Sequence, residues 1–469
     1  MGLTKHIYCI QDLEEQDIAS APSLDLPDIE VEKYFLPKDN GRYMLLFANT
    51  RKDIYPKECP YCGATDTMKR AGNGQRRLIH DVVRNNFRVD IALLPKRFEC
   101  TKCGAKTTPT LRGIEDKRQM TTRLFEFLQT ECFLQSHTAL AERSGFSVES
   151  IQNIMDEEIE KYENERRAHP LPAPRVLGID EKHITRLMRG TLVDVESGLL
   201  LDMLEDNRAQ TMKEAIMRLV NWNVNIEVIT TDMNNSYLIW LSKFLPNATI
   251  VIDKFHIIQD IQRRISTAKK SLYKYRKELI RGIEDGEEKT RQMTILNLLN
   301  KNQRLFNYSM ETLVRDDSSS KIMDLSVIIE EFPEFRLLRK LFYLIELMYL
   351  QESYQDAEAI WDEWQKVLPP GGEKQYHEWC DFYSVQPPLF DEFRSFTKTN
   401  FLFFKPYILN YFRPGCRFTN AVTEGLNNLI ERINRDGNGL SFKSLRAKSL
   451  YASLIHERRQ YGIDVKTIK

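Results

Sequence analysis

Three short apolar runs in the middle of the chain each end in an aspartate, and this pattern constrains the fold more than any other feature. The runs are residues 175–180, 227–232 and 249–253, and they are rich in valine and isoleucine. Runs of this length and composition predict buried strands. A carboxylate at the end of a buried strand is costly unless a positive charge meets it. We therefore expect Asp180 and Asp232 to hold a metal cation.

The elements around these strands follow the order of one α/β catalytic core. Residues 192–204 predict an antiparallel hairpin and residues 209–222 an amphipathic helix, and two further strands then end at Asp232 and Asp253. A hairpin followed by strand–helix units is the order of the ribonuclease-H-like fold, whose first and fourth strands are neighbours. Asp180 and Asp232 are then expected side by side at the carboxyl end of the sheet, where the sites of α/β proteins form.

A third acid lies far downstream, beyond a long helical stretch. Residues 263–410 have a strongly helical pattern and predict an all-α insertion that interrupts the core, while residues 417–430 predict a helix that carries Glu424. Two aspartates and a glutamate on two strands and a helix are the parts of a phosphoryl-transfer site for two Mg²⁺ or Mn²⁺ ions. Any one such acid alone is more often a helix cap or an ion-pair partner, so it is the combination that favours a metal site.

Two Cys-x-x-Cys-Gly motifs predict a structural Zn²⁺ site nearer the N-terminus. The four cysteines are Cys59, Cys62, Cys100 and Cys103. Four thiolates suit one tetrahedral zinc ion per chain. We predict a zinc ribbon over residues 51–112. It follows an N-terminal lead-in over residues 1–50, to which we assign no function. Redox or unlinked thiols are the alternative, and disulfides fit poorly in the cytoplasm, where the lack of a signal-peptide pattern places the protein.

Basic residues make DNA a candidate partner of this ribbon. The candidates for contact are Arg76, Arg77, Arg84 and Arg88. A ribbon that docks only to protein is the alternative. The basic stretch at the start of the helical insertion, with Lys269 and Lys270, suits phosphate contacts and a solvated helix face equally well. The net charge does not indicate whether the protein binds DNA, because 67 basic residues balance 67 acidic ones.

Residues 113–170 predict a helix-turn-helix domain. Gly145 permits a tight turn between two helices, and Ser147 is placed to cap the second helix. The first turn of that helix, with Ser147 and Ser150, would enter the major groove of DNA. An ordinary pair of helices has the same glycine turn, so this alternative stays open. The proline-rich residues 170–174 predict a linker to the catalytic core.

The order of zinc ribbon, helix-turn-helix and interrupted acidic core resembles the DDE transposases of bacterial insertion sequences, and within these it is most similar to the L3 family. The matching pieces are the two cysteine motifs, residues 178–181, the strand that ends at Asp232, residues 253–256 and residues 420–435. Lys254 stands where the family often has arginine. The resemblance implies a catalytic triad of Asp180, Asp232 and Glu424.

The resemblance also implies what the triad does. Such a transposase binds the terminal inverted repeats of its element, hydrolyses the DNA there and joins the freed 3′-hydroxyl to target DNA. Asp180 would bridge the two ions, and Asp253, His256 and Asn420 are candidates for supporting roles around them. The alternatives are a capped strand end with a core histidine, and an asparagine that only caps or packs its helix.

The implied partners are double-stranded DNA, from the terminal repeats and the target, and a second copy of the chain when two ends are synapsed. We expect these partners in a bacterial cytoplasm, associated with the nucleoid. No apolar run is long enough to cross a bilayer, so no membrane partner is expected. The sequence does not indicate the repeat sequence, the target preference or the pathway of transposition.

The chain is therefore predicted as a multi-domain α/β protein. Residues 171–262 and 411–469 form its core, and residues 263–410 interrupt it. Two other functions stay open, namely a non-catalytic DNA-binding protein derived from a transposase and another ribonuclease-H-like nuclease. Metal-dependent strand cleavage separates the first of these from a transposase.

Overall fold

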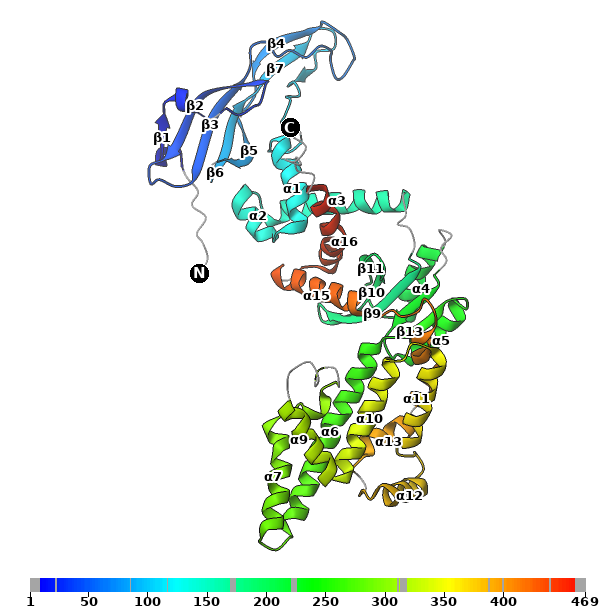
Figure 1. The fold of residues 1–469 in the computed structure, drawn as a ribbon. Coiled ribbons are helices and arrows are strands. Elements are labelled where there is room, and N and C mark those ends of the chain that lie inside the picture. The colour runs from blue at the N-terminus through cyan, green and yellow to red at the C-terminus, as the bar shows by residue number, and fades with distance from the viewer. Residues whose placement is uncertain are drawn as a thin grey trace, which may run out of the picture. The chain divides into compact units, whose positions relative to one another are not determined.

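The computed structural model divides into two compact units, coloured along the chain in Figure 1. The first contains Met1–Pro170 and Arg432–Lys469, and the second contains Leu171–Glu431. The described residues are 9–21, 23–84, 86–115, 117–168, 174–220, 226–309, 312, 319–386, 389–398, 400–437 and 440–459. The linker predicted at residues 170–174 lies outside them except for Pro174.

A five-stranded sheet forms the N-terminal part of the first unit. Its order is β1-β2-β3-β6-β5, with β3 and β6 parallel and the other neighbours antiparallel. The strands are β1 (Leu13–Gln16), β2 (Ile29–Pro37), β3 (Tyr43–Thr50), β5 (Arg77–Arg84) and β6 (Phe87–Leu94), with the short 3-10 helices η1 (Ile10–Asp12) and η2 (Ile18–Ser20) beside them. Leu46, Ile79 and Ile91 are fully buried in its core. The strands between Leu13 and Thr50 thus share one sheet with strands from the segment predicted as zinc ribbon.

A smaller antiparallel sheet of order β4-β7-β8 carries the second cysteine motif. Its strands are β4 (Met68–Asn73), β7 (Lys96–Cys100) and β8 (Lys106–Thr107). Phe98 of β7 is fully buried, and its ring meets the ring of Tyr55 edge-on with centroids 5.0 Å apart. This aromatic contact supports the sheet close to the end of β7, where Cys100 stands.

The helices of the first unit begin at hydroxyl caps. They are α1 (Thr122–Leu134), α2 (His137–Ser144), α3 (Val148–Ala168) and α16 (Phe442–Arg459). The side chains of Thr121, Ser136 and Ser147 each accept a hydrogen bond from the amide three residues further on, at 3.4, 3.2 and 3.0 Å. Gly145 ends α2 with a φ of +82°, a conformation that favours glycine. The predicted cap at Ser147 and the predicted turn at Gly145 are both confirmed.

The last helix, α16, packs against α1 within this unit. The ring of Tyr451 stacks on that of Tyr162 with centroids 4.7 Å apart, and its hydroxyl donates to Glu163 at 2.9 Å. Lys448 donates to the main-chain oxygens of Gln135, at 2.8 Å, and Cys132 at the end of α1. Residues 432–469 therefore belong to the first unit, which differs from our placement of this segment in the catalytic core.

The second unit is built on a mixed sheet of order β11-β10-β9-β12-β13. The strands are β9 (Val176–Ile184), β10 (Leu187–Asp194), β11 (Leu199–Met203), β12 (Val228–Thr231) and β13 (Thr249–Ile252), and helices α4 (Ala209–Val220) and α5 (Asn235–Phe244) follow β11 and β12. The first three strands are antiparallel, whereas β12 is parallel to both β9 and β13. The predicted hairpin is confirmed, and so is the pairing of the strands that lead to Asp180 and Asp232.

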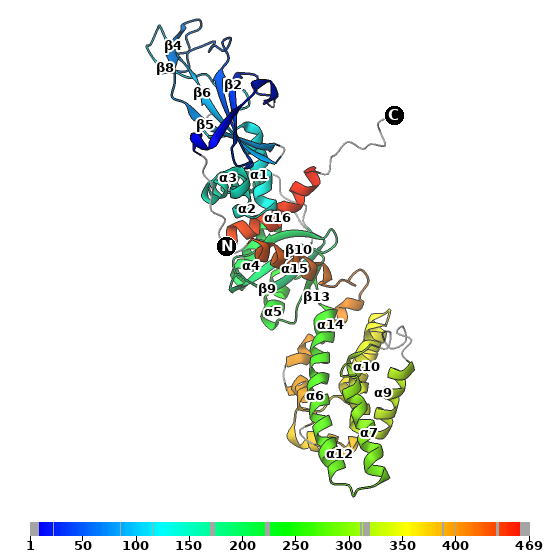
Figure 2. The ribbon, with the colours of Figure 1, turned by 90° about the vertical axis from the view of Figure 1, so that its left-hand side faces the viewer.

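Helices follow the sheet. They are α6 (Lys254–Arg281), α7 (Glu287–Lys301), α9 (Ser319–Glu331), α10 (Pro333–Tyr349), α11 (Tyr354–Val367), α12 (Glu373–Tyr383), α13 (Asp391–Lys398) and α14 (Lys405–Leu409), with the 3-10 helices η3 (Leu305–Asn307), η4 (Asn400–Phe404) and η5 (Asn410–Phe412). The long helices α6, α7, α9 and α10 run side by side (Figures 1 and 2). Trp361 and Trp364 of α11 are fully buried, and the ring centroid of Phe401 lies 6.0 Å from that of each. None of the described helices combines the length and apolarity that crossing a bilayer requires.

Candidate metal centres

Two aspartates meet at the carboxyl end of the central strands. Gly178 of β9 lies opposite Thr230 of β12 in a parallel register, so Asp180 and Asp232, each two residues further along, stand level with each other. Asp180 is 7% exposed and Asp232 is half-buried. Burial raises the pKa of both carboxyls, and the charge of Asp180 contributes to raising the pKa of Asp232 to about 7. Two neighbouring carboxylates in a buried place are poorly tolerated without a cation.

Asp180 is held through both of its oxygens. Its Oδ1 accepts a hydrogen bond from the amide of Glu181 at 2.7 Å, and its Oδ2 accepts one from Nδ2 of Asn427 at 2.6 Å. Both bonds favour the ionised form of this carboxyl. Asn427 lies on α15 (Ala421–Asp436), the helix that also carries Glu424. The carboxylate therefore has a fixed orientation before any ligand binds.

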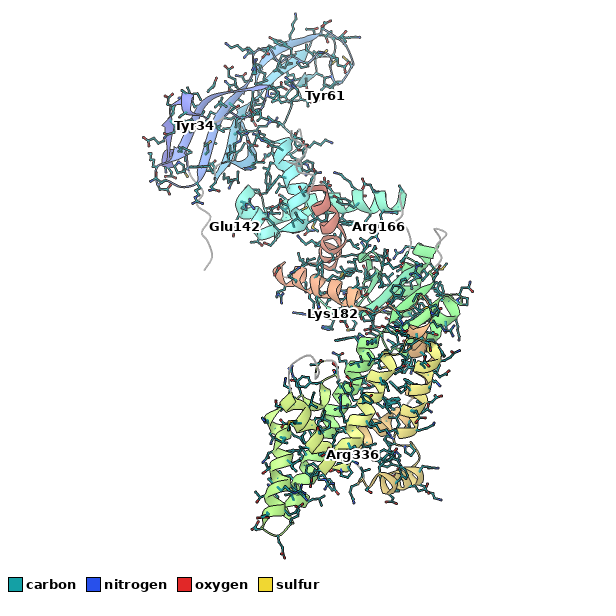
Figure 3. All side chains as sticks on the ribbon, viewed as in Figure 1. Tyr34, Tyr61, Glu142, Arg166, Lys182 and Arg336 are labelled. Atoms are coloured by element: carbon teal, nitrogen blue, oxygen red, sulfur yellow. The ribbon has the colours of Figure 1, made fainter. Side chains whose placement is uncertain are left out.

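The helix α15 lies against the strand β9 at Gly178. A Cβ atom on this glycine would come within 2.6 Å of Oγ1 of Thr423, so a side chain there would push the helix and strand apart. On the same strand, Lys182 forms an ion pair of 3.1 Å with Glu431 of α15 (Figure 3). Close packing at one end and an ion pair at the other place Glu424 near the two aspartates.

Asn420, just before α15, joins this helix to three strands of the sheet. Its amide nitrogen donates to Oδ1 of Asp253 at 3.0 Å, and its Nδ2 donates to the main-chain oxygen of Ile179 at 3.2 Å. Its Oδ1 accepts a hydrogen bond of 2.6 Å from the hydroxyl of Thr230. The side chain is fully buried and its donors and acceptor are engaged with protein groups. These hydrogen bonds fix the residue that precedes α15 to the sheet.

Asp253, His256 and Glu424 form a second group beside the aspartates. One ligand atom from each of the three lies within 4.8 Å of the others. Nδ1 of His256 lies 3.0 Å from Oδ2 of Asp253 and 3.1 Å from Oδ1 of Asp232. The hydrogen bond with Asp253 is the main cause that raises the pKa of His256 to about 9. The imidazolium is thus the positive charge that this acidic cluster receives from the protein itself.

The oxygens gathered here suit a divalent cation. Burial and then the charge of Asp253 raise the pKa of Glu424, and Oδ1 of Asp232 accepts no aligned hydrogen bond among the described residues. Hard cations such as Mg²⁺ and Mn²⁺ prefer carboxylate and carbonyl oxygens. A cation would offset the burial and repulsion that raise these pKa values, so the residues present fit such an ion.

A cleft of about 360 Å³ opens beside Asp180 and Asp232. Glu181 also lines it, and its carboxylate accepts hydrogen bonds from Nδ2 of Asn207, at 2.7 Å, and of Asn234, at 3.3 Å. These two partners lie next to α4 and α5, whereas the partner of Asp180 comes from α15. The alternation of the strand thus turns Glu181 to the other face.

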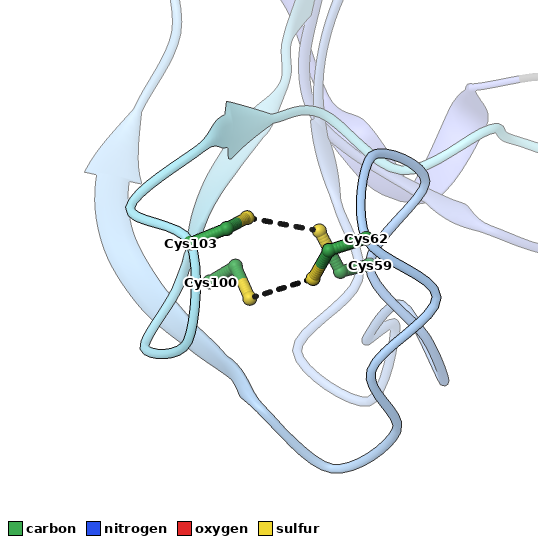
Figure 4. Close-up of side chains that lie close together, drawn as sticks. All are labelled: Cys59, Cys62, Cys100 and Cys103. Atoms are coloured by element: carbon green, nitrogen blue, oxygen red, sulfur yellow. Dashed lines mark hydrogen bonds between the residues drawn. The ribbon is translucent and has the colours of Figure 1, made fainter.

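Four sulfur atoms converge in the first unit (Figure 4). Sγ of Cys59 lies 3.6 Å from that of Cys103, and Sγ of Cys62 lies 3.8 Å from that of Cys100. A regular tetrahedron with Zn–S bonds of about 2.3 Å has sulfurs about 3.8 Å apart. The four thiols therefore have the spacing of a zinc site.

The two halves of this cysteine site have the same backbone geometry. Gly63 and Gly104 follow the second cysteine of each motif with φ of +67° and +69°, and each donates its amide, at 2.8 Å, to the oxygen of the first cysteine. A positive φ at this position favours glycine. The repeated turn explains why Gly follows each Cys-x-x-Cys.

Most of the arginines predicted to contact DNA are engaged within the protein. Arg76 donates to the main-chain oxygen of Ala92 at 2.7 Å, and Arg84 to those of Ser23 and Leu24. The guanidinium of Arg88 pairs with Asp90 at 3.3 Å and occupies the space where a Cβ of Gly145 would lie. Arg77 has a buried Nε without a hydrogen-bond partner among the described residues.

The other predicted DNA contacts differ in exposure. Ser147 is exposed and Ser150 is half-buried at the start of α3, where their hydroxyls lie 2.9 Å apart. Lys269 donates to the main-chain oxygen of Gln303, and burial lowers its pKa. Lys270 beside it is exposed. The structure therefore leaves Ser147, Lys270 and Arg76 exposed, whereas Arg77, Arg84 and Arg88 are half-buried.

Sequence comparison adds one match. A protein-family model described as a transposase, of the DDE class and ISL3 type, matches residues 177–449. The matched segment begins within β9 and ends within α16, so it contains all three predicted catalytic acids. No curated protein matches the chain with significant similarity.

Proposed function

Because this chain belongs to the transposase family of the DDE class and ISL3 type, we propose that it cuts DNA at the ends of an insertion sequence and joins them to a target. Asp180, Asp232 and Glu424 are its catalytic acids in this proposal. The observation that carries it is the level placement of Asp180 and Asp232 on neighbouring parallel strands, with α15 packed against the first of them.

The sheet supports a ribonuclease-H-like core. Three antiparallel strands followed by parallel β12 and β13 give the order expected of that fold, and α6 to α14 stand between the second acid and the third. The long helical segment is then an insertion into the core. Its aromatic interior, including Trp361 and Trp364, belongs to the same hydrophobic cluster as the core residues of the sheet.

Both proposed reactions are displacements at phosphorus. In the first, a water oxygen bonds to phosphorus while the bond to the 3′-oxygen of the element breaks, and the water proton is lost to solvent. In the second, the freed 3′-oxygen bonds to a phosphorus of the target while the bond to the target's own 3′-oxygen breaks. Two divalent cations, when bound, supply charge stabilisation for the attacking and the leaving oxygens.

The chain's own residues prepare this site. Asp180, Asp232 and Glu424 would hold the cations, with Asp180 oriented by its two hydrogen bonds. His256 holds the carboxylates of Asp232 and Asp253 in place. Asn420 fixes the start of α15 to the sheet, which keeps Glu424 at a constant distance from the aspartates.

The first unit is the proposed DNA-binding part. A zinc ribbon held by the four cysteines and a helix-turn-helix formed by α2 and α3 would bind the terminal repeats. The hydroxyl-capped, exposed start of α3 at Ser147 supports the second of these roles, because the start of a recognition helix must be free to enter a groove. A dimer that joins two ends, in a bacterial cytoplasm near the nucleoid, completes the proposal.

The test is strand cleavage of a duplex that carries the DNA flanking the gene, with Mg²⁺ or Mn²⁺. Wild-type protein is expected to cut at the repeat ends, and Asp232→Asn is expected to bind the same DNA without cutting it. Tight binding without cleavage by wild type under either metal would favour a non-catalytic DNA-binding descendant of a transposase. Cleavage of branched DNA without regard to the repeats would favour another ribonuclease-H-like nuclease.

A further inference from the structure

Asn427 is a buried polar residue that belongs neither to the predicted triad nor to the residues predicted to support it. It lies on α15, one helical turn after Glu424, and is 2% exposed. Its Nδ2 donates the 2.6 Å hydrogen bond to Oδ2 of Asp180. The contact joins residues that are far apart in the sequence and links the helix of the third acid directly to the first acid.

The other end of the same amide has no partner. Oδ1 of Asn427 is buried and accepts no hydrogen bond among the described residues. A buried acceptor left unpaired costs about 1–3 kcal/mol, so native proteins retain few of them without a reason. The two heavy atoms of one amide lie about 2.3 Å apart, which places this oxygen within about 5 Å of Oδ2 of Asp180. The unpaired oxygen is therefore part of the acidic site.

Asn420, the residue before α15, provides the contrast. Within the helix, Glu424 and Asn427 lie on one face, because a spacing of three residues brings side chains into line. The amide of Asn420 is fully engaged by the sheet, with Ile179 and Thr230 as partners. Asn427 is equally buried but keeps a free oxygen beside the carboxylates. Packing thus accounts for Asn420 and not for Asn427.

We propose that Asn427 is a positioning residue of the cation site, which holds Asp180 through Nδ2 and offers Oδ1 as a neutral oxygen to the cation or its hydration shell. The inference rests on the proposed function, since it assumes that Asp180 binds a divalent cation. Residues that orient a metal-bound carboxylate contribute strongly to affinity, and their loss weakens metal binding by about 10–100-fold. A neutral oxygen adds a ligand without adding a further negative charge to the site of Asp180, Asp232 and Glu424.

The first experiment measures Mn²⁺ binding to the intact protein without DNA, by the electron paramagnetic resonance signal of free Mn²⁺. Asn427→Ala is expected to weaken binding by at least about tenfold. Asn428→Ala is the matched control, because Asn428 is the next residue of the same helix and is exposed. It is expected to bind Mn²⁺ as wild type does. Unchanged affinity in folded Asn427→Ala would overturn the proposal.

The second experiment separates a role at the cation from a role in packing. Asn427→Asp replaces the donor that faces Asp180 with a carboxylate, so it is expected to destabilise the protein when divalent cations are absent. If Oδ1 faces the cation, Mn²⁺ should raise the melting temperature of Asn427→Asp by more than it raises that of wild type. If Asn427 only packs the helix, the variant should stay destabilised and show no larger shift, which would contradict the proposal.

Asp180→Asn distinguishes failure of this inference from failure of the proposed function. When Asp180→Asn loses Mn²⁺ binding but Asn427→Ala does not, the cation site is supported and the proposed role of Asn427 is contradicted. When neither variant changes Mn²⁺ binding, the cation site itself is wrong. Weakened binding in both variants, with Asn428→Ala unchanged, is the result that we expect.

Discussion

Oγ1 of Thr423 lies 2.6 Å from the point where a Cβ of Gly178 would stand. Gly178→Ala should therefore force β9 and α15 apart, at a cost of about 1–3 kcal/mol for overpacking. We expect lower stability in urea and a larger loss of DNA cleavage, because Glu424 and Asn427 both move with the helix. Gly425→Ala is the control, since a Cβ there meets no atom within 4 Å and the helix should gain a little stability. Equal behaviour of the two variants would contradict this packing argument.

The pair of Asp232 and Asp180 predicts a pH dependence of stability in buffer without free divalent cations. Burial, and then the charge of Asp180, raise the pKa of Asp232 to about 7 in the folded protein, against about 3.9 in the unfolded chain. The folded state then binds the extra proton, so the contribution of Asp232 to stability is greatest below about pH 4 and is lost as the pH rises through about 7. Asp232→Asn removes the charge, and its melting temperature relative to wild type should rise between pH 5 and pH 8.

Mn²⁺ should reverse that order at pH 8, because the cation stabilises the two carboxylates of wild type and finds only one in the variant. Differential scanning fluorimetry at matched ionic strength measures both effects. A wild type whose melting temperature depends on pH no more steeply than that of Asp232→Asn would argue that the two aspartates are not coupled.

The zinc site predicts a change in metal content. Cys59→Ser leaves three of the four sulfurs that lie within 4.8 Å of one another, so the purified protein should lose its zinc. The sheet of β4, β7 and β8 should then become less stable. Atomic emission gives the stoichiometry, which we expect to fall from about one zinc per chain to near zero. Cys9→Ser, at an exposed cysteine outside the cluster, should keep its zinc. Full zinc retention in Cys59→Ser would remove zinc from this site.

The C-terminal helix predicts an effect on distant residues. Lys448→Met removes a buried ammonium that donates to the carbonyl oxygens of Cys132 and Gln135, and the loss of these two hydrogen bonds should cost about 1–3 kcal/mol. Amide hydrogen exchange in α1 should accelerate. Lys443→Ala breaks only the exposed pair with Asp156 and should change stability by less than about 1 kcal/mol. Unchanged exchange in Lys448→Met would show that α16 does not support α1.

Local sequence patterns predicted the elements of the site well. Strands that end in acids, a hairpin before them and a capped helix at Ser147 are all encoded in residues close together in the chain, and the structure contains each of them. The pairing of β9 with β12 followed from the order of the elements. These features depend on periodicity and turn chemistry, which a sequence shows directly.

Long-range partners were harder to predict. The parallel pairing of β3 with β6 and the packing of α16 on α1 join segments whose own patterns do not identify their neighbours. The sequence shows the charge of the arginines in the predicted ribbon. It does not show the carbonyl oxygens and carboxylates that form hydrogen bonds and ion pairs with Arg76, Arg84 and Arg88. The sequence analysis did not identify Asn427 as a site residue, although its spacing from Asn420 and Glu424 fits one helical face. An uncharged asparagine in a helix is not by itself a signal for a metal site.

The contact of α16 with α1 has a consequence for synthesis on the ribosome. Tyr451 and Lys448 pack on residues that emerge more than three hundred positions earlier, so the first unit stays incomplete until nearly the whole chain has been translated. The segment of Leu171–Glu431 carries its own sheet and core and can fold before that moment. If the first unit binds DNA, newly made protein would acquire this ability last, only after the acids that we propose as catalytic are already in place.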